Sequence, residues 1–132
     1  MPFVVLANRK IESLSKKALA KERGPTMANF LLLYTGGSMP QTPAEQEQVM
    51  AAWNAWFGKI GSNLVDGGNP FTPMAKSISS NGTVSDGPVG ELASGYSIIK
   101  ADSLDAAVSI ARECPVTLGG AKITVYETFP VM

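Results

Sequence analysis

Histidine is absent from this 132-residue sequence, and its absence removes several kinds of catalytic site at once. The chain cannot build a histidine-based metal site, nor a serine or cysteine nucleophile activated by an imidazole. The single cysteine, Cys114, leaves no intrachain disulfide, which favours a reducing, cytoplasmic setting. No apolar run approaches the length of a membrane span, so we expect no membrane partner.

What the sequence does contain is enough for an ordinary core, since 45% of its residues are hydrophobic and 17% are charged. The 11 basic and 11 acidic residues balance, but they are unevenly distributed. Residues 1–26 carry six Lys or Arg against two Glu, whereas residues 27–132 carry five against nine Asp or Glu. An acidic domain argues against nucleic-acid binding, which needs a basic face to neutralise phosphates.

Residues 1–26 are therefore expected to be a basic N-terminal extension of a domain that spans residues 27–132. Residues 16–23 favour a short helix, which Gly24-Pro25 would end. One interpretation is a basic arm that touches an anionic partner. The interpretation that we favour is a poorly ordered tail, or translation from a start codon upstream of Met27.

Two helices are predicted by their caps and apolar stripes. Thr42-Pro43-Ala44-Glu45 combines a capping box with proline at the first helical position, and Gly61 suits a C-terminal cap. Asp102 or Ser103 begins the second helix, and Pro115 ends it. The apolar stripes comprise Val49, Trp53, Trp56, Phe57 and Ile60 in the first helix, and Leu104, Ala107, Val108, Ala111 and Cys114 in the second.

Four strands and a hairpin account for most of the remaining chain. Residues 29–35 are apolar on both faces, as in a strand that is buried on two sides. Residues 63–65, 95–101 and 121–129 supply the other strands, and the last of these alternates between apolar and polar side chains. Asn81-Gly82, between two further extended segments, predicts a β-hairpin.

The resulting order, β-α-β-hairpin-β-α-β, predicts a ferredoxin-like α+β fold with an antiparallel sheet. Two helices can cover only one face of a four-stranded sheet. Because the first strand is apolar on both sides, the second face should also be buried. Two sheets paired face to face across a two-fold axis would bury it, so we expect a homodimer with a barrel-like interior.

The turn Ser85-Asp86-Gly87-Pro88 is accompanied by Asp66-Gly67-Gly68 after the first helix, by Gly95-Tyr96 opening the third main strand, and by Cys114-Pro115. Together with the first strand and residues 101–107, these features resemble the DGPF-motif branch of the YCII-related family, over about residues 27–131. The resemblance implies a dimeric α+β barrel with a cleft beside the Asp-Gly-Pro turn.

Two features depart from that family. Val89 stands where the motif has phenylalanine, so a ring that lines the cleft is missing. Some members carry a histidine on the first strand, proposed to work with the motif aspartate, and this chain has none. The resemblance therefore implies the family's scaffold but not its histidine–aspartate pair.

Asp86 is the candidate catalytic residue. If it were buried against apolar walls, its carboxyl group would serve as a general acid or base. The alternative that we favour is that Asp86 accepts hydrogen bonds from backbone N–H groups of its own turn and so holds the Gly-Pro bend.

The candidate ligand-binding residues surround the implied cleft. Tyr34 ends one strand and Tyr96 begins its predicted neighbour, so both phenols face the cavity between subunits or else complete the core. Asp66 begins either a loop whose glycines permit a ligand to approach the backbone closely, or an ordinary turn. Ser85 contacts a ligand or turns to solvent. The full set is Tyr34, Asp66, Ser85, Gly87, Pro88 and Tyr96.

These residues favour a non-catalytic, dimeric domain that binds a small molecule. The alternative is a cofactor-independent enzyme, such as a lyase, isomerase or dehydrochlorinase, that uses Asp86 for proton transfer on an oxygen-rich or aromatic substrate. That alternative depends mainly on family analogy. Neither function calls for a metal or another cofactor.

Overall fold

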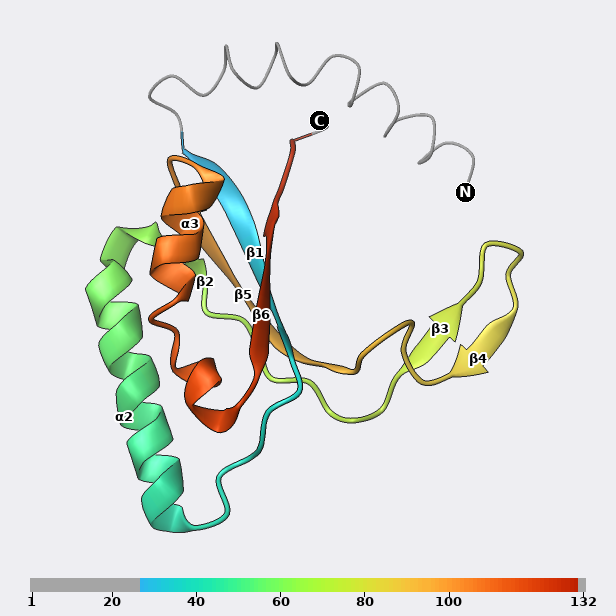
Figure 1. The fold of residues 1–132 in the computed structure, drawn as a ribbon, viewed down its shortest axis with the longest axis horizontal. Helices are drawn as coiled ribbons and strands as arrows, with labels where there is room; N and C mark the ends of the chain where they lie inside the picture. Colours follow the sequence, from blue (N-terminus) through green and yellow to red (C-terminus); the bar gives the residue numbers. More distant parts are fainter. Residues whose placement is uncertain (1–26, 131–132) are drawn as a thin grey trace.

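Four strands form an antiparallel sheet in the order β2-β5-β1-β6 in the computed structural model, which describes residues 27–130 (Figure 1). With two helices against this sheet, the predicted α+β class is confirmed. The predicted extension, residues 1–26, lies outside the described residues. The strands are β1 (Ala28–Thr35), β2 (Leu64–Asp66), β5 (Ala93–Ala101) and β6 (Lys122–Glu127).

Helix α2 (Pro43–Ile60) begins where its capping sequence predicts. The Thr42 hydroxyl accepts a hydrogen bond from the Glu45 backbone N–H at 3.1 Å. The Glu45 carboxylate reaches back to the N–H of Gln41, one residue before the cap, at 2.7 Å. Together these bonds satisfy backbone donors that a helix start would otherwise leave open.

Helix α3 (Leu104–Ala111) is capped by Ser103, whose hydroxyl accepts from the Ala106 N–H at 3.1 Å. Of the two predicted caps, Asp102 and Ser103, the helix therefore uses Ser103. A 3₁₀ turn, Pro115–Gly119, follows, so the helix ends earlier than the proline that was expected to end it. Both helices lie on the same side of the sheet (Figure 1).

The core lies between the helices and one face of the sheet. Phe30, Leu32 and Ile99 are fully buried there, and Trp56 of α2 is 3% exposed. The apolar stripes are buried only in part, and α2 extends past the end of the sheet (Figure 1). The stripe residues that remain exposed are Val49, Leu104 and Val108.

Strands β3 (Lys76–Ile78) and β4 (Val84–Asp86) form the hairpin that Asn81-Gly82 predicts. They make a separate two-stranded sheet, which projects from the main sheet on the side away from the helices (Figure 1). We call residues 76–86 the arm. The candidate residues Ser85 and Asp86 therefore lie on a projection and not in the body of the protein.

The second face of the main sheet has no helix on it within residues 27–130 (Figure 1). Because side chains alternate along a strand, the residues between those of the core point to this face. The pairings Leu31 with Ile98 and Tyr126, and Leu33 with Tyr96, place these five side chains together. We call this group the open sheet face.

Candidate functional site

Asp86 lies at the base of the arm, where its side chain is 89% exposed. Its carboxylate forms an ion pair with the Lys76 ammonium at 2.6 Å, across the β3–β4 ladder. Ser85 pairs with Ser77 in that ladder, so Ser85 and Asp86 point to opposite faces of the arm. The structure does not bring Asp86 to either candidate tyrosine, and its catalytic role stays a prediction.

Gly87 and Pro88 close the arm where it returns to the main sheet. Gly87 has φ +87°, a region that favours glycine, and its N–H donates to the Ala75 carbonyl at 2.8 Å. The predicted bend is therefore held by a backbone hydrogen bond across the hairpin. The Asp86 side chain makes its bond to Lys76 instead.

Tyr34 lies on the helix side of the sheet and is 4% exposed. Its hydroxyl donates to the Ser97 hydroxyl at 2.7 Å, and the Ser97 hydroxyl donates to the Gly67 carbonyl at 2.8 Å. The Cys114 thiol donates to the Tyr34 oxygen at 3.6 Å. This chain of three hydrogen bonds ties β1 and β5 to the loop after β2 and to the end of the α3 segment.

Tyr34 and Tyr96 consequently do not share a cavity. Gly95 pairs with Tyr34, and Leu33 pairs with Tyr96, so the two phenols point to opposite faces of the sheet. Of the two predicted alternatives, a cavity between subunits or the core, Tyr34 takes the core. Tyr96 alone lies on the open sheet face.

Burial changes the acidity of two groups in the core. Desolvation raises the pKa of the Tyr34 phenol, and it raises the pKa of the Cys114 thiol as well. Both groups therefore stay protonated, and Cys114, 1% exposed, is a poor nucleophile. The predicted packing role of Cys114 agrees with this position.

The Asp66-Gly67-Gly68 loop makes the close approach that its glycines permit, but to a strand of the same chain. A Cβ atom on Gly68, which has φ +76°, would lie 1.6 Å from the Tyr96 carbonyl oxygen. Asp66 accepts a hydrogen bond from the Gly68 N–H at 2.8 Å and so stabilises the turn. These residues fix the loop against β5.

Aromatic side chains gather where the arm joins the open sheet face. Phe71 stacks on Tyr96, with ring centroids 5.8 Å apart and an interplanar angle of 29°. The Phe71 N–H donates to the Ser94 carbonyl at 2.8 Å. The Ser94 hydroxyl oxygen is buried and has no hydrogen-bond partner among residues 27–130. We call Phe71, Ser94 and Tyr96 the aromatic corner.

Sequence reasoning missed Phe71 and Ser94. No local pattern pairs Phe71 with a residue 25 positions later, and Ser94 lies beside the bulge between Tyr34 and Thr35 in the β1–β5 register. The described residues around the Ser94 hydroxyl therefore leave its hydrogen-bonding capacity unused. The corner therefore offers stacking surface together with one hydroxyl.

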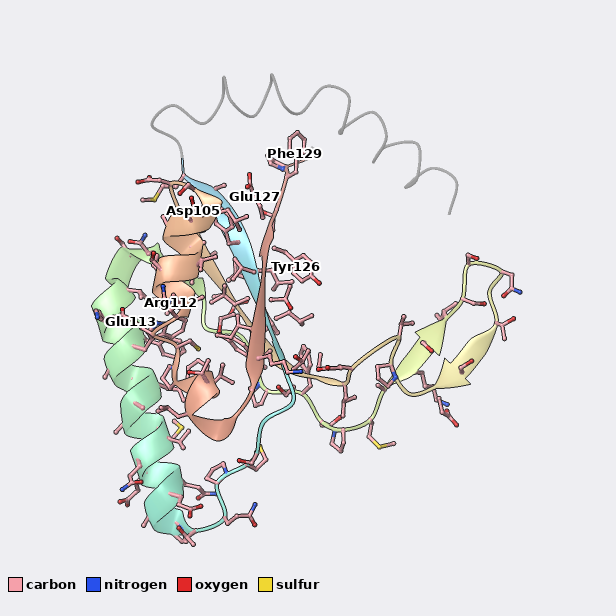
Figure 2. The ribbon with its side chains drawn as sticks, viewed as in Figure 1. Asp105, Arg112, Glu113, Tyr126, Glu127 and Phe129 are labelled. Atoms are coloured by element: carbon pink, nitrogen blue, oxygen red, sulfur yellow. The ribbon has the colours of Figure 1, made fainter. Side chains whose placement is uncertain are left out.

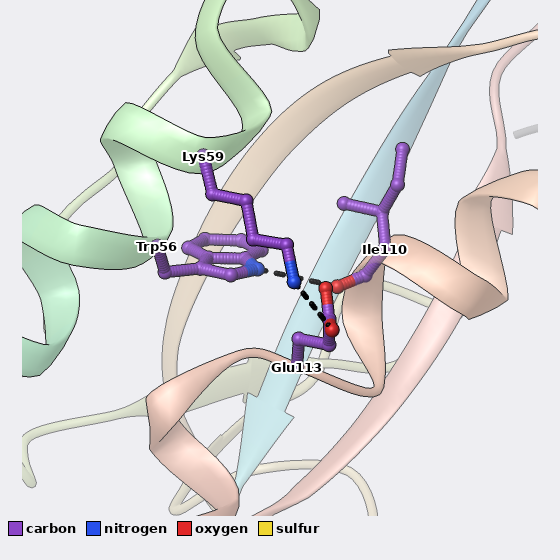
Figure 3. Close-up of polar contacts among 4 residues, drawn as sticks. All are labelled: Trp56, Lys59, Ile110 and Glu113. Carbon is purple, nitrogen blue, oxygen red and sulfur yellow. Dashed lines mark hydrogen bonds and ion pairs between the residues drawn. The ribbon is translucent and has the colours of Figure 1, made fainter.

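A shallow groove of about 390 Å³ lies on the helix side, between α2 and the 3₁₀ turn. Its floor includes Trp56, whose indole N–H donates to the Ile110 carbonyl at 3.2 Å (Figure 3). Lys59 and Glu113 form an ion pair of 2.7 Å above it (Figure 3). Both charges are exposed and satisfy each other, and Arg112 also lines the groove.

Among residues 27–130, no three aspartate, glutamate or cysteine side chains lie close enough together to hold a metal ion. No helix within residues 27–130 is long and apolar enough to cross a membrane. No family model matches the chain, and no curated protein matches it.

Proposed function

We propose that this chain is one subunit of a homodimer that binds a small molecule where two open sheet faces meet. The observation that carries the proposal is the open sheet face itself. Leu31, Leu33 and Ile98 form an apolar surface in the middle of the sheet, and Tyr126 beside them is 51% exposed. Figure 2 draws the Tyr126 side chain on the side of β6 away from the helices.

A second copy is the favoured partner for this surface because two-fold pairing buries the same face on both chains. Sheets packed face to face lie about 10 Å apart, and side chains from both fill the space between them. In this proposal the strand order β2-β5-β1-β6 corresponds to a ferredoxin-like protomer. The protein would then be of the YCII-related, DGPF-motif type and would act in the cytoplasm.

The aromatic corner supports binding of an aromatic or flat apolar molecule that carries one polar oxygen. Phe71 and Tyr96 offer ring faces, and the buried Ser94 hydroxyl offers one hydrogen bond. Catalysis by Asp86 has less support, because its carboxylate is solvated and already paired with Lys76. Binding is therefore the function that we favour.

Leu33→Lys tests the pairing of the sheets. A charge in the middle of the open sheet face should raise the dimer dissociation constant at least a hundredfold in sedimentation velocity, because it would be buried without a partner. Val108→Lys, on the outer side of α3, is the matched control and should leave the constant unchanged. A Leu33→Lys protein that dimerises like the wild type would refute the proposed interface.

Binding itself is tested with a panel of phenols and aromatic carboxylates, detected by saturation-transfer NMR. Molecules that bind the wild type should lose their signal with Phe71→Ala and weaken with Ser94→Ala. Leu118→Ala, on the helix side, should retain binding. No binding to the wild type at millimolar concentration, or signals that survive Phe71→Ala, would contradict the assignment.

A further inference from the structure

The arm carries apolar side chains that no other residue among 27–130 covers. Ile78 is 70% exposed and Val84 is 58% exposed, and they pair with each other in the β3–β4 ladder. The Lys76–Asp86 pair lies on the same face of the ladder, two residues away. An isolated two-stranded hairpin is at best marginally stable in water, so this face needs a packing surface.

The arm leaves the protein next to the open sheet face and on the same side of the sheet (Figure 1). The chain that leads into the arm is fastened there, since Pro70 forms a bridge to Gly95 and Phe71 stacks on Tyr96. The arm therefore projects from the edge of the open sheet face. A partner that covers the open sheet face also meets the arm.

The length of the arm decides how far it reaches into that partner. From Lys76 to the turn at Asn81-Gly82 the arm has six residues, which span up to about 20 Å if extended at about 3.3 Å per residue. Two paired sheets are separated by only about 10 Å. The arm is therefore long enough to pass the plane of the second sheet.

We propose that the arm of each subunit packs its Ile78–Val84 face on the second copy of this chain, so that each aromatic corner is completed by the arm of the other subunit. The inference rests on the proposed dimer. It explains why a solvated hairpin carries an apolar face, because two-fold symmetry supplies both arms with a surface. It also brings Asp86 and Lys76 to the boundary between the subunits.

The double variant Ile78→Asp/Val84→Asp tests the arm in the full-length chain. Sedimentation velocity should show a dimer dissociation constant raised at least tenfold, because the charges replace buried apolar groups in both subunits. Leu118→Asp is the matched control: Leu118 is 82% exposed on the 3₁₀ turn, on the helix side, and its replacement should change nothing. Wild-type dimerisation by the double variant would refute the arm contact while leaving the sheet pairing intact.

A labelling experiment follows the position of the arm without disturbing the interface. Ile78→Cys should react with an exposed-thiol reagent at least tenfold more slowly in the dimer than in the Leu33→Lys background, while Leu118→Cys reacts equally in both. Native Cys114 is buried and adds little signal. Equal rates for Ile78→Cys in a confirmed dimer would overturn the arm contact alone, whereas a monomeric wild type would overturn the proposed function as well.

Discussion

Tyr34→Phe removes one oxygen atom from the centre of the buried hydrogen-bond chain and preserves the ring. The Ser97 hydroxyl would keep its bond to the Gly67 carbonyl but lose the donor that now lies at 2.7 Å. The Cys114 thiol would lose its acceptor. Because the aromatic packing of Tyr34 against Trp53 stays in place, the variant isolates the polar contribution.

The cost follows from these two losses. A buried hydrogen bond contributes about 1 kcal/mol net, and leaving a buried partner unsatisfied costs about 1–3 kcal/mol. The thiol is a weak donor, so most of the penalty comes from Ser97. We expect the free energy of unfolding to fall by about 1–2 kcal/mol, which lowers Tm by about 4–9 °C in a domain of this size.

Urea unfolding followed by tryptophan fluorescence measures this change, at one fixed protein concentration because the chain is proposed to dimerise. Ser109→Ala is the control: it removes an exposed hydroxyl from α3, on the helix side of the sheet, and we expect a change of less than about 0.5 kcal/mol. If Tyr34→Phe were as stable as Ser109→Ala, the hydrogen-bond chain would have no structural role.

Gly68→Ala should abolish the native fold, because its Cβ would collide with the Tyr96 carbonyl, whereas Gly82→Ala, with open space around it, should cost only about 1–2 kcal/mol. Circular dichroism separates the two outcomes, and a folded Gly68→Ala would contradict the close approach. Raising the pH from about 8 to about 10 should lower stability, because burial raises the pKa of Cys114 and Tyr34, so that only the unfolded chain ionises there. Cys114→Ala should reduce the loss of unfolding free energy in the lower half of this pH range, measured by urea unfolding at each pH. An unchanged loss would contradict the raised pKa of Cys114.

Local chemistry was sufficient to predict the elements of this fold. The cap at Thr42 and the hairpin at Asn81-Gly82 depend on residues close in sequence, and both occur as predicted. Alternation also separates the residues of β1 into two rows. Neighbouring side chains decide these features, so the sequence pattern contains the necessary information.

The side that each row of β1 faces could not be predicted in the same way. Leu31 and Leu33 are as apolar as Phe30 and Leu32, so periodicity does not show which row the helices cover. Tyr34 lies in the same row as Phe30 and Leu32 and is buried with them under the helices. Tyr96 lies on the opposite face of the sheet, and only tertiary packing decides which face the helices cover. The stacking of Phe71 on Tyr96 likewise depends on how the arm leaves the sheet.

The central claim is that the open sheet face is covered by a second copy of this chain. Light scattering on the wild-type protein at tens of micromolar tests it most directly. We predict a mass twice the 13.9 kDa of the chain. A mass equal to that of one chain at this concentration would contradict the dimer, the shared ligand site and the arm contact together.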